Sequence, residues 1–231
     1  MTYSPQEIFT AVDQNTAMFF AIGGVALIIN YVFFISAALD ARRDKVFTFP
    51  LALSTLWFAH DLSYVLSYNE WFNVYGHWYV KNFWYGLIPT TLFEAWYIYQ
   101  TWLYGKDEIL PRGSRRAFNG FMVLAILAGL VSWYALKQFL DDPLYVWAFG
   151  STGFLTPIFV IGRMMRRGDA KGQSVLTWTA YTGMQICWFS NVILLFGDAF
   201  HTPAYLAMAA TSIVGGVAMA VLTHRMNRRN A

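Results

Sequence analysis

Charged side chains are scarce in this sequence. Asp, Glu, Lys and Arg together make up 13% of the 231 residues, whereas they make up about 25% of an ordinary soluble domain. Hydrophobic residues make up 57% of the chain, and the mean hydropathy is +0.40. These values indicate that water is not its main solvent and that much of the chain lies in a lipid bilayer. No linker-like or low-complexity tract interrupts the apolar segments, so we expect a single domain over residues 1–231.

Cysteine and the common catalytic motifs are also rare or absent. Cys187 is the only cysteine, so neither a disulfide nor a cysteine-based metal site is possible within the chain. Three of the four histidines lie in loops or at the ends of apolar runs, which argues against a multi-histidine metal site. No Gly-rich phosphate loop, HExxH or GxSxG motif occurs. The sequence therefore predicts no metal and no cofactor.

Seven mostly apolar runs of about twenty residues follow one another along the chain. Each is long enough to cross the hydrocarbon core as a helix, and a helix satisfies its own backbone hydrogen bonds there. We therefore expect an all-α integral membrane bundle of seven transmembrane helices. The predicted spans are 17–38, 49–68, 84–104, 117–136, 144–162, 175–196 and 203–223. The opening segment before them has no Lys or Arg, so the first span is not expected to be a cleaved signal peptide.

The basic residues follow alternate predicted spans. Fourteen of the sixteen Lys and Arg residues come after spans one, three, five and seven, and only Lys81 and Lys137 fall in the other loops. Cytoplasmic loops are enriched in Lys and Arg. This bias places the N-terminus outside and the C-terminus in the cytoplasm, and it predicts a multi-pass protein of the cell (inner) membrane. Charges grouped by loop do not suggest a nucleic-acid surface, and homo-oligomerisation stays open.

An aromatic-rich segment, NEWFNVYGHWYVKNFWY at residues 69–85, is predicted to lie on the outer side between spans two and three. Its Trp and Tyr residues are typical of an interfacial aromatic belt, which is the favoured interpretation. A short lid that lies on the membrane is the alternative.

An internal repeat is allowed by the orientation of the spans. Residues 17–104 and 144–223 each hold three predicted spans in the same orientation, joined by the fourth span. Within them, the segment Trp57-Phe58-Ala59-His60 can be aligned with Trp188-Phe189-Ser190-Asn191, and Pro89 with Pro203. This 3+1+3 plan resembles the SWEET and PQ-loop transporters, although the Pro-Gln dipeptide itself is absent.

Two acidic residues lie well inside the apolar runs. Asp61, in LWFAHDLSY, and Glu94, in TTLFEAWYIYQ, occupy positions where an ionised group costs several kcal/mol. Such residues usually face the interior of a bundle, and we expect each carboxyl group to keep its proton at neutral pH because desolvation disfavours the charged form. A protonated carboxyl group in an apolar cavity is a potential general acid. The alternative is that each acid only joins neighbouring helices through hydrogen bonds.

Helical spacing assigns polar and aromatic residues to stripes on three of the predicted spans. If the stripes converge, they form an aromatic-walled site with two acids, whose predicted substrate-binding residues are Trp57, Tyr97, Tyr181, Gln185, Trp188 and Asn191. Asp61 and Tyr64 share a stripe with Trp57, and Glu94 shares one with Tyr97. His60 is adjacent to Asp61, and neighbouring helical residues point about 100° apart, so we do not expect these two side chains to form one site.

Two segments resemble the membrane-bound terpene cyclases of fungal meroterpenoid and indole-diterpene pathways and their bacterial relatives. Residues 40–71 resemble the family's short basic first loop and the helix after it, whose Trp-Glu-x-x-Tyr pattern is matched here by His60-Asp61-x-x-Tyr64. Residues 168–188 resemble its later Arg-Gly-x-Ser loop and the aromatic helix that follows. The family's acid in the last helix has no counterpart, because residues 203–223 contain no Asp or Glu.

The resemblance implies a cofactor-independent isomerase that cyclises a lipophilic prenyl or epoxyprenyl substrate by acid-initiated carbocation chemistry. In this hypothesis Asp61 donates the proton with help from Tyr64 or His60, and Glu94 or Asn191 positions a base or water for termination. The first alternative is a SWEET-like small-solute transporter in which Asp61 and Glu94 bind a proton or polar solute at mid-membrane. The second is a noncatalytic lipid-binding or assembly protein.

Overall fold

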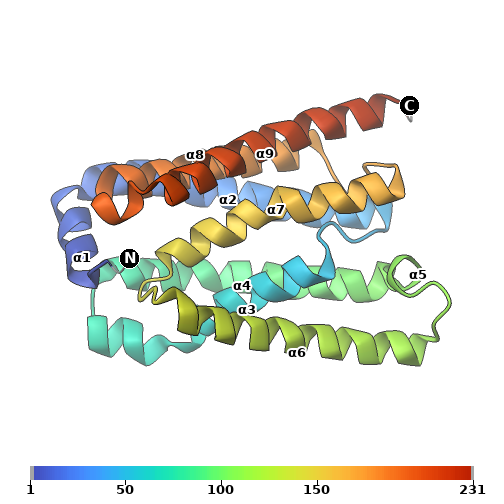
Figure 1. The fold of residues 1–231 in the computed structure, drawn as a ribbon, viewed down its shortest axis with the longest axis horizontal. Coiled ribbons are helices and arrows are strands. Elements are labelled where there is room, and N and C mark those ends of the chain that lie inside the picture. Colours follow the sequence, from blue (N-terminus) through green and yellow to red (C-terminus); the bar gives the residue numbers. More distant parts are fainter. Residues whose placement is uncertain (1–2, 230–231) are drawn as a thin grey trace.

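The computed structural model describes residues 3–229, which contain helices and connecting segments and no strand. Seven helices of sixteen residues or more make up most of this region (Figure 1). They are α2 (Thr16–Asp44), α3 (Leu51–Leu66), α4 (Trp78–Tyr104), α6 (Arg115–Leu140), α7 (Val146–Arg167), α8 (Val175–Leu195) and α9 (Pro203–Arg229). The shorter elements are α1 (Pro5–Gln14), the π-helix η1 (Glu70–Tyr75), α5 (Lys106–Ile109) and the 3-10 helix η2 (Asp198–Phe200).

The all-α prediction is therefore confirmed, and each predicted span corresponds to one of the seven long helices. The shortest of these helices is α3, which begins at Leu51 and ends at Leu66. The aromatic segment after it forms η1 and the first turns of α4, and Trp71 in η1 is fully buried. The Trp71 ring stacks on Tyr64 at 4.2 Å between centroids, and its Nε1 donates a hydrogen bond of 2.7 Å to the Tyr64 carbonyl oxygen. Trp71 is thus part of the core and not of an interfacial belt.

Three helices, α2, α6 and α9, are long and apolar enough to cross a membrane. Much of their apolar surface faces outward. Val131 of α6 is 67% exposed and Ile28 of α2 is 66% exposed, for example. Large apolar faces on a monomer in water are rare, so this surface is compatible with a membrane protein.

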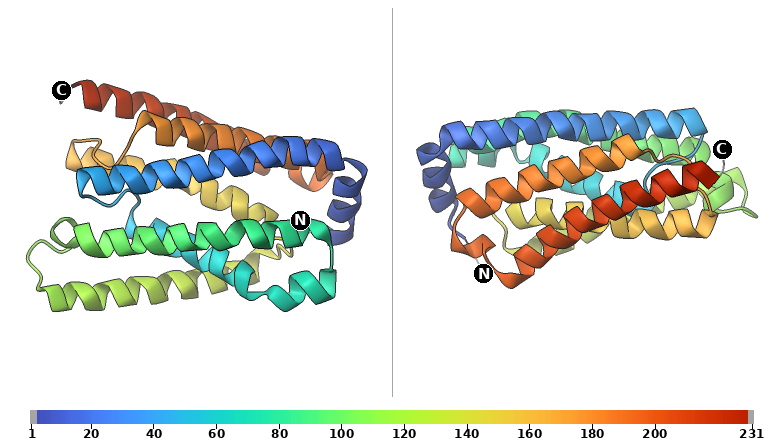
Figure 2. Two further views of the ribbon diagram at one scale, coloured as in Figure 1. Left: turned by 180° about the vertical axis from the view of Figure 1, so that it is seen from behind. Right: turned by 90° about the horizontal axis from the view of Figure 1, so that it is seen from above.

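We divide six of the long helices by their order in the chain into two sets, the first unit (α2, α3 and α4) and the second unit (α7, α8 and α9). In each unit the third helix contacts both others, so α4 packs on α2 and α3, and α9 packs on α7 and α8. The units meet where α2 packs along α8 and α3 packs on α7 (Figure 2). The linking helix α6 packs on α3, and the two backbones approach closely at Gly129, where an added Cβ would lie 2.7 Å from Thr55 Cβ.

Candidate functional site

A cavity of about 580 Å³ lies between the two units. Its volume falls within the range of small-molecule sites, about 300–1,000 Å³. Side chains of α2, α3, α4, α7 and α8 line it. Of the residues predicted from the sequence, seven line this cavity: Trp57, Asp61, Glu94, Tyr181, Gln185, Trp188 and Asn191. The predicted stripes on α3, α4 and α8 therefore converge on one site.

The carboxyl group of Asp61 is held from two sides. Thr90 Oγ1 of α4 donates a hydrogen bond of 2.7 Å to Asp61 Oδ2, and His60 Nδ1 lies 2.7 Å from Asp61 Oδ1. Glu94 follows Thr90 by one helical turn, so its side chain lies on the same face of α4, and it lines the same cavity as Asp61. Glu94 Oε2 is buried and has no hydrogen-bond partner among the described residues. Both acids thus lie buried on the wall of one cavity.

The expectation that His60 and Asp61 would not share a site was wrong. Although the two side chains leave the helix in different directions, the His60 ring turns back far enough for its Nδ1 to contact Asp61 Oδ1. His60 does not line the cavity. Its ring is buried against Trp133, Tyr145 and Phe149, at centroid distances of 4.6, 5.5 and 4.6 Å. His60 is therefore placed behind Asp61, where it fixes the orientation of the carboxyl group.

Tyr64 and Tyr97 lie outside the cavity. The Tyr64 hydroxyl donates a hydrogen bond of 3.2 Å to the carbonyl oxygen of Val80, so it is directed away from Asp61 and is not placed to assist it. The Tyr97 hydroxyl donates a hydrogen bond of 2.7 Å to the carbonyl oxygen of Phe34, and its ring packs on Phe49 at 5.0 Å between centroids. Tyr97 therefore supports the aromatic cluster beneath the cavity and does not line the site itself.

The aromatic wall is oriented by the backbone of α7. Pro157 has no N–H, so the carbonyl oxygen of Gly153, four residues earlier, has no helical donor. The Tyr181 hydroxyl fills that place with a hydrogen bond of 2.7 Å to Gly153. One residue before it, the Thr152 carbonyl oxygen accepts a hydrogen bond of 3.3 Å from Trp57 Nε1. Both aromatic side chains are thus tied to α7 by their polar atoms while they line the cavity.

The cavity reaches the outer surface of the bundle between α2 and α4. Among its lining residues, Phe20 and Leu27 of α2 and Tyr85 of α4 are exposed by 50%, 43% and 60%. Below this gap the Tyr31 hydroxyl donates a hydrogen bond of 3.1 Å to the carbonyl oxygen of Gly86, which joins the two helices. Toward the end of the bundle where α3 and α8 begin, buried aromatic residues pack together and close the cavity; they include Phe33, Phe34, Phe49, Trp57 and Tyr97.

Sequence reasoning missed the contribution of α2. Gly23 and Gly24 line the cavity, and an added Cβ at Gly24 would meet nothing within 4 Å. The Gly-Gly pair inside an apolar run is the signal for this open wall, because glycine leaves room beside a helix.

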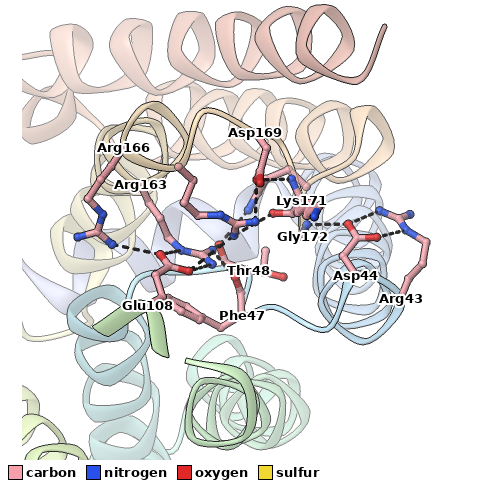
Figure 3. Close-up of polar contacts among 12 residues, drawn as sticks. Arg43, Asp44, Phe47, Thr48, Glu108, Arg163, Arg166, Asp169, Lys171 and Gly172 are labelled. Carbon is pink, nitrogen blue, oxygen red and sulfur yellow. Dashed lines mark hydrogen bonds and ion pairs between the residues drawn. The ribbon is translucent and has the colours of Figure 1, made fainter. Parts of the chain in front are cut away.

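A second polar group, which sequence reasoning also missed, lies at the end of the bundle where α3 begins. The guanidinium of Arg163 is buried, donates to both carboxylate oxygens of Glu108 at 2.8 and 2.9 Å, and lies 3.6 Å from the centroid of the Phe47 ring (Figure 3). It also donates to the carbonyl oxygens of Phe47 and Thr48. Arg163 thus joins the second unit to the turn after α2 and to α5.

Neither a family model, nor a curated protein, nor a solved structure matches this chain. Within residues 3–229, no group of three or more His, Cys, Asp or Glu side chains is arranged to hold a metal ion.

Proposed function

We propose that this protein is a membrane-embedded terpene cyclase that isomerises a lipophilic prenyl or epoxyprenyl substrate by acid-initiated carbocation chemistry. The observation that carries this proposal is the buried pair of Asp61 and Glu94 on the wall of a large, mostly aromatic and apolar cavity. A cavity beside Asp61 is a reason to favour this over a purely structural role for the two acids.

The proposed reaction begins with a proton held by the acid pair. Two interacting carboxyl groups in a site of low polarity keep at least one proton between them. Asp61, oriented by His60 and Thr90, delivers this proton to the terminal alkene or epoxide. The resulting cation is attacked by another double bond of the same chain, which forms a ring. Loss of a proton to Glu94 ends the sequence and leaves the pair protonated as before, so substrate and product are isomers.

The aromatic wall suits the cationic intermediates. The faces of Trp and Tyr rings attract cations by about 0.5–2 kcal/mol each, and Trp57 and Tyr181 are held beside the acids by their hydrogen bonds to α7. The closed aromatic cluster on the cytoplasmic side excludes water, which would otherwise capture the cation early.

In this proposal all seven long helices cross the membrane, with the N-terminus outside. The loops rich in Lys and Arg then lie on the cytoplasmic side. The helix α3 has only sixteen residues, and it carries His60 and Asp61 toward the interior. A bundle interior that holds a polar site requires such helices.

The test is to express the protein in membranes, supply prenylated and epoxidised substrates, and analyse the products by mass spectrometry. Asp61→Asn and Glu94→Gln should each abolish the cyclised product. Asp40→Asn is the matched control, because Asp40 is also a buried carboxyl group but lies outside the cavity, and this variant should keep its product. Full turnover in Asp61→Asn would refute the assignment.

A second candidate is a SWEET-like transporter of small solutes, which the packing order of the helices favours. The third helix contacts both others in each unit, as a 3+1+3 repeat would require. The cavity opens on one side and is closed by aromatic residues on the other, which is compatible with one state of an alternating-access cycle. Solute flux in proteoliposomes without any chemical change of the solute would favour this candidate over the cyclase.

A further inference from the structure

The α8 side of the cavity carries two amide side chains that the proposed acid chemistry does not use. Gln185 and Asn191 are 3% and 5% exposed, and both line the cavity. Neither amide forms a hydrogen bond within the described region, and Gln185 Oε1 and Asn191 Oδ1 are buried acceptors without a partner. A buried polar group without a partner costs about 1–3 kcal/mol. Two of them on one cavity wall indicate groups that a ligand satisfies.

The fold holds both amides at the cavity wall. An added Cβ at Gly153 of α7 would lie 2.5 Å from Gln185 Nε2, and one at Gly23 of α2 would lie 3.3 Å from Asn191 Nδ2. Each amide therefore rests against a glycine on the neighbouring helix, with no side chain at that position to bond it. The Gln185 and Asn191 amides are six residues apart on α8, which corresponds to about 9 Å along the helix axis.

The two amides lie at different depths. Gln185 is the eleventh residue of α8 and Asp61 the eleventh of α3, and both helices start at the cytoplasmic end, so Gln185 lies at about the depth of the acid pair. Asn191 lies near the outer end of α8, beside Gly23 at the open side of the cavity. One polar point is thus near the acids and the other near the outer opening.

We propose that Gln185 and Asn191 are two binding points for a ligand that carries an oxygen function at each end of an apolar chain. Asn191 binds a hydroxyl group at the outer end, because a hydroxyl both donates and accepts and so satisfies an amide in either orientation. Gln185 binds a second hydroxyl group at the far end, whose O–H donates to the unpaired Gln185 Oε1. This inference rests on the proposed function and narrows its substrate class to prenyl chains that are oxygenated at both ends.

Equilibrium binding of two matched probe pairs to the purified protein in lipid nanodiscs tests each point separately. The first pair is farnesol and farnesyl methyl ether, which differ in the hydroxyl donor. The second is farnesyl methyl ether and its ω-hydroxy derivative, which differ in the hydroxyl group at the far end. We expect wild type to prefer farnesol, and the ω-hydroxy ether, each by about tenfold, since one such hydrogen bond is worth about 1.4 kcal/mol.

The variants should separate the two preferences. Asn191→Leu should lose the preference for farnesol and keep that for the ω-hydroxy ether, and Gln185→Leu should do the reverse. Gln100→Leu is the matched control, because Gln100 is a buried amide on α4 outside the cavity, and it should keep both. Equal affinities within both probe pairs in wild type, or preferences unchanged in Asn191→Leu and Gln185→Leu, would overturn the inference.

Binding and chemistry can fail independently in this design. If the preferences appear but no probe is ever cyclised, the two-point binding site stands and the proposed function fails. If cyclised product forms and the preferences are absent, the proposed function stands and this inference fails. A variant that does not fold is recognised by its loss of affinity for all three probes, and Gln185→Met and Asn191→Ala then replace the leucine variants.

Discussion

The two three-helix units pack in the same order but present different chemistry to the cavity. Counted from the first residue of each helix, Trp57 of α3 corresponds to Tyr181 of α8, and Asp61 corresponds to Gln185. Trp57 and Tyr181 both bond to carbonyl oxygens of α7, whereas an acid on one side is matched by an amide on the other. Under the proposed function, one scaffold supplies proton chemistry from the first unit and neutral polar recognition from the second.

The corresponding residues Asp61 and Gln185 also differ in their hydrogen-bond partners. Asp61 has partners in His60 and Thr90, and Gln185 has no partner. A reactive carboxyl group needs a fixed orientation, while an amide that binds a ligand needs free hydrogen-bonding capacity. Under the proposed function, only the first unit is therefore suited to acid catalysis. Experiments that move the acid or break the contacts of either unit test this difference.

The largest effect is expected from moving the acid to the second unit. In Asp61→Asn/Gln185→Glu the carboxyl group lies on α8, where no equivalent of His60 or Thr90 orients it. Product formation, measured by mass spectrometry, should fall by about 10³-fold, since a positioned general acid contributes about 10²–10⁴-fold. Asp61→Glu, which keeps the carboxyl group on α3, should retain more activity than this double variant. Recovery of near wild-type turnover in the double variant would remove the distinction between the units.

Removing the hydrogen bonds that Arg163 donates should give the next largest effect, a loss of stability. Arg163→Ala leaves Glu108 and the carbonyl oxygens of Phe47 and Thr48 without their donor. We expect a loss of about 3–5 kcal/mol, the usual cost of breaking a buried ion pair, measured by thermal unfolding in detergent. Arg166→Ala is the control, because Arg166 contacts the same carboxylate from an exposed position and should cost at most about 1 kcal/mol. Similar losses in both variants would show that burial of Arg163 is unimportant.

A smaller effect is expected at the proline of the second unit. Tyr181→Phe removes the donor to the Gly153 carbonyl oxygen and should cost about 1–2 kcal/mol. In the background of Pro157→Ala, the new N–H of residue 157 can bond to Gly153, so the same change should cost less. A double-mutant cycle by thermal unfolding measures this coupling. Additive losses would mean that the hydroxyl does not replace the missing helical donor.

The smallest effect is expected when the pH is lowered, because protonation of Glu108 weakens its ion pair with Arg163. Burial alone would raise the pKa of Glu108, but its hydrogen bonds and charge interactions with Arg163 outweigh burial, and the pKa lies below the ordinary 4.5. A lowered folded-state pKa gives stability that is present above about pH 4.5 and is lost as the pH falls through the folded value. Wild type should therefore exceed Glu108→Gln in melting temperature at pH 7, and the difference should shrink below pH 4. A constant difference from pH 7 to pH 3 would contradict this.

Much of the helical architecture was predictable because apolar runs and their length determine membrane-type helices. The periodicity of α3, α4 and α8 also identified the residues that converge on the cavity, since Asp61, Glu94 and Gln185 each lie four positions after another lining residue, namely Trp57, Thr90 and Tyr181. The match of Trp57 with Trp188 does not carry over, because Trp57 is the seventh residue of α3 and Trp188 the fourteenth of α8. Nor does the match of Pro89 with Pro203, because Pro89 lies inside α4 and Pro203 is the first residue of α9.

Other features could not be predicted because they depend on contacts between distant segments. The short amphipathic helix α1 precedes the first apolar run, and with 10 residues it is too short to be recognised as a membrane span. The contact of His60 with Asp61 depends on how neighbouring aromatic rings turn the imidazole. The bonds of Arg163 join residues that are more than fifty positions apart.

If the cavity takes an oily substrate, as we propose, the gap between α2 and α4 also has a consequence for how the reaction rate is measured. A guest that arrives sideways through Gly23 and Gly24 is drawn from the surrounding lipid, where oily molecules accumulate far above their aqueous level. Half-saturation would then follow the mole fraction of substrate in the bilayer. Diluting the assay with empty vesicles should slow the rate even when the total amount of substrate per millilitre is unchanged.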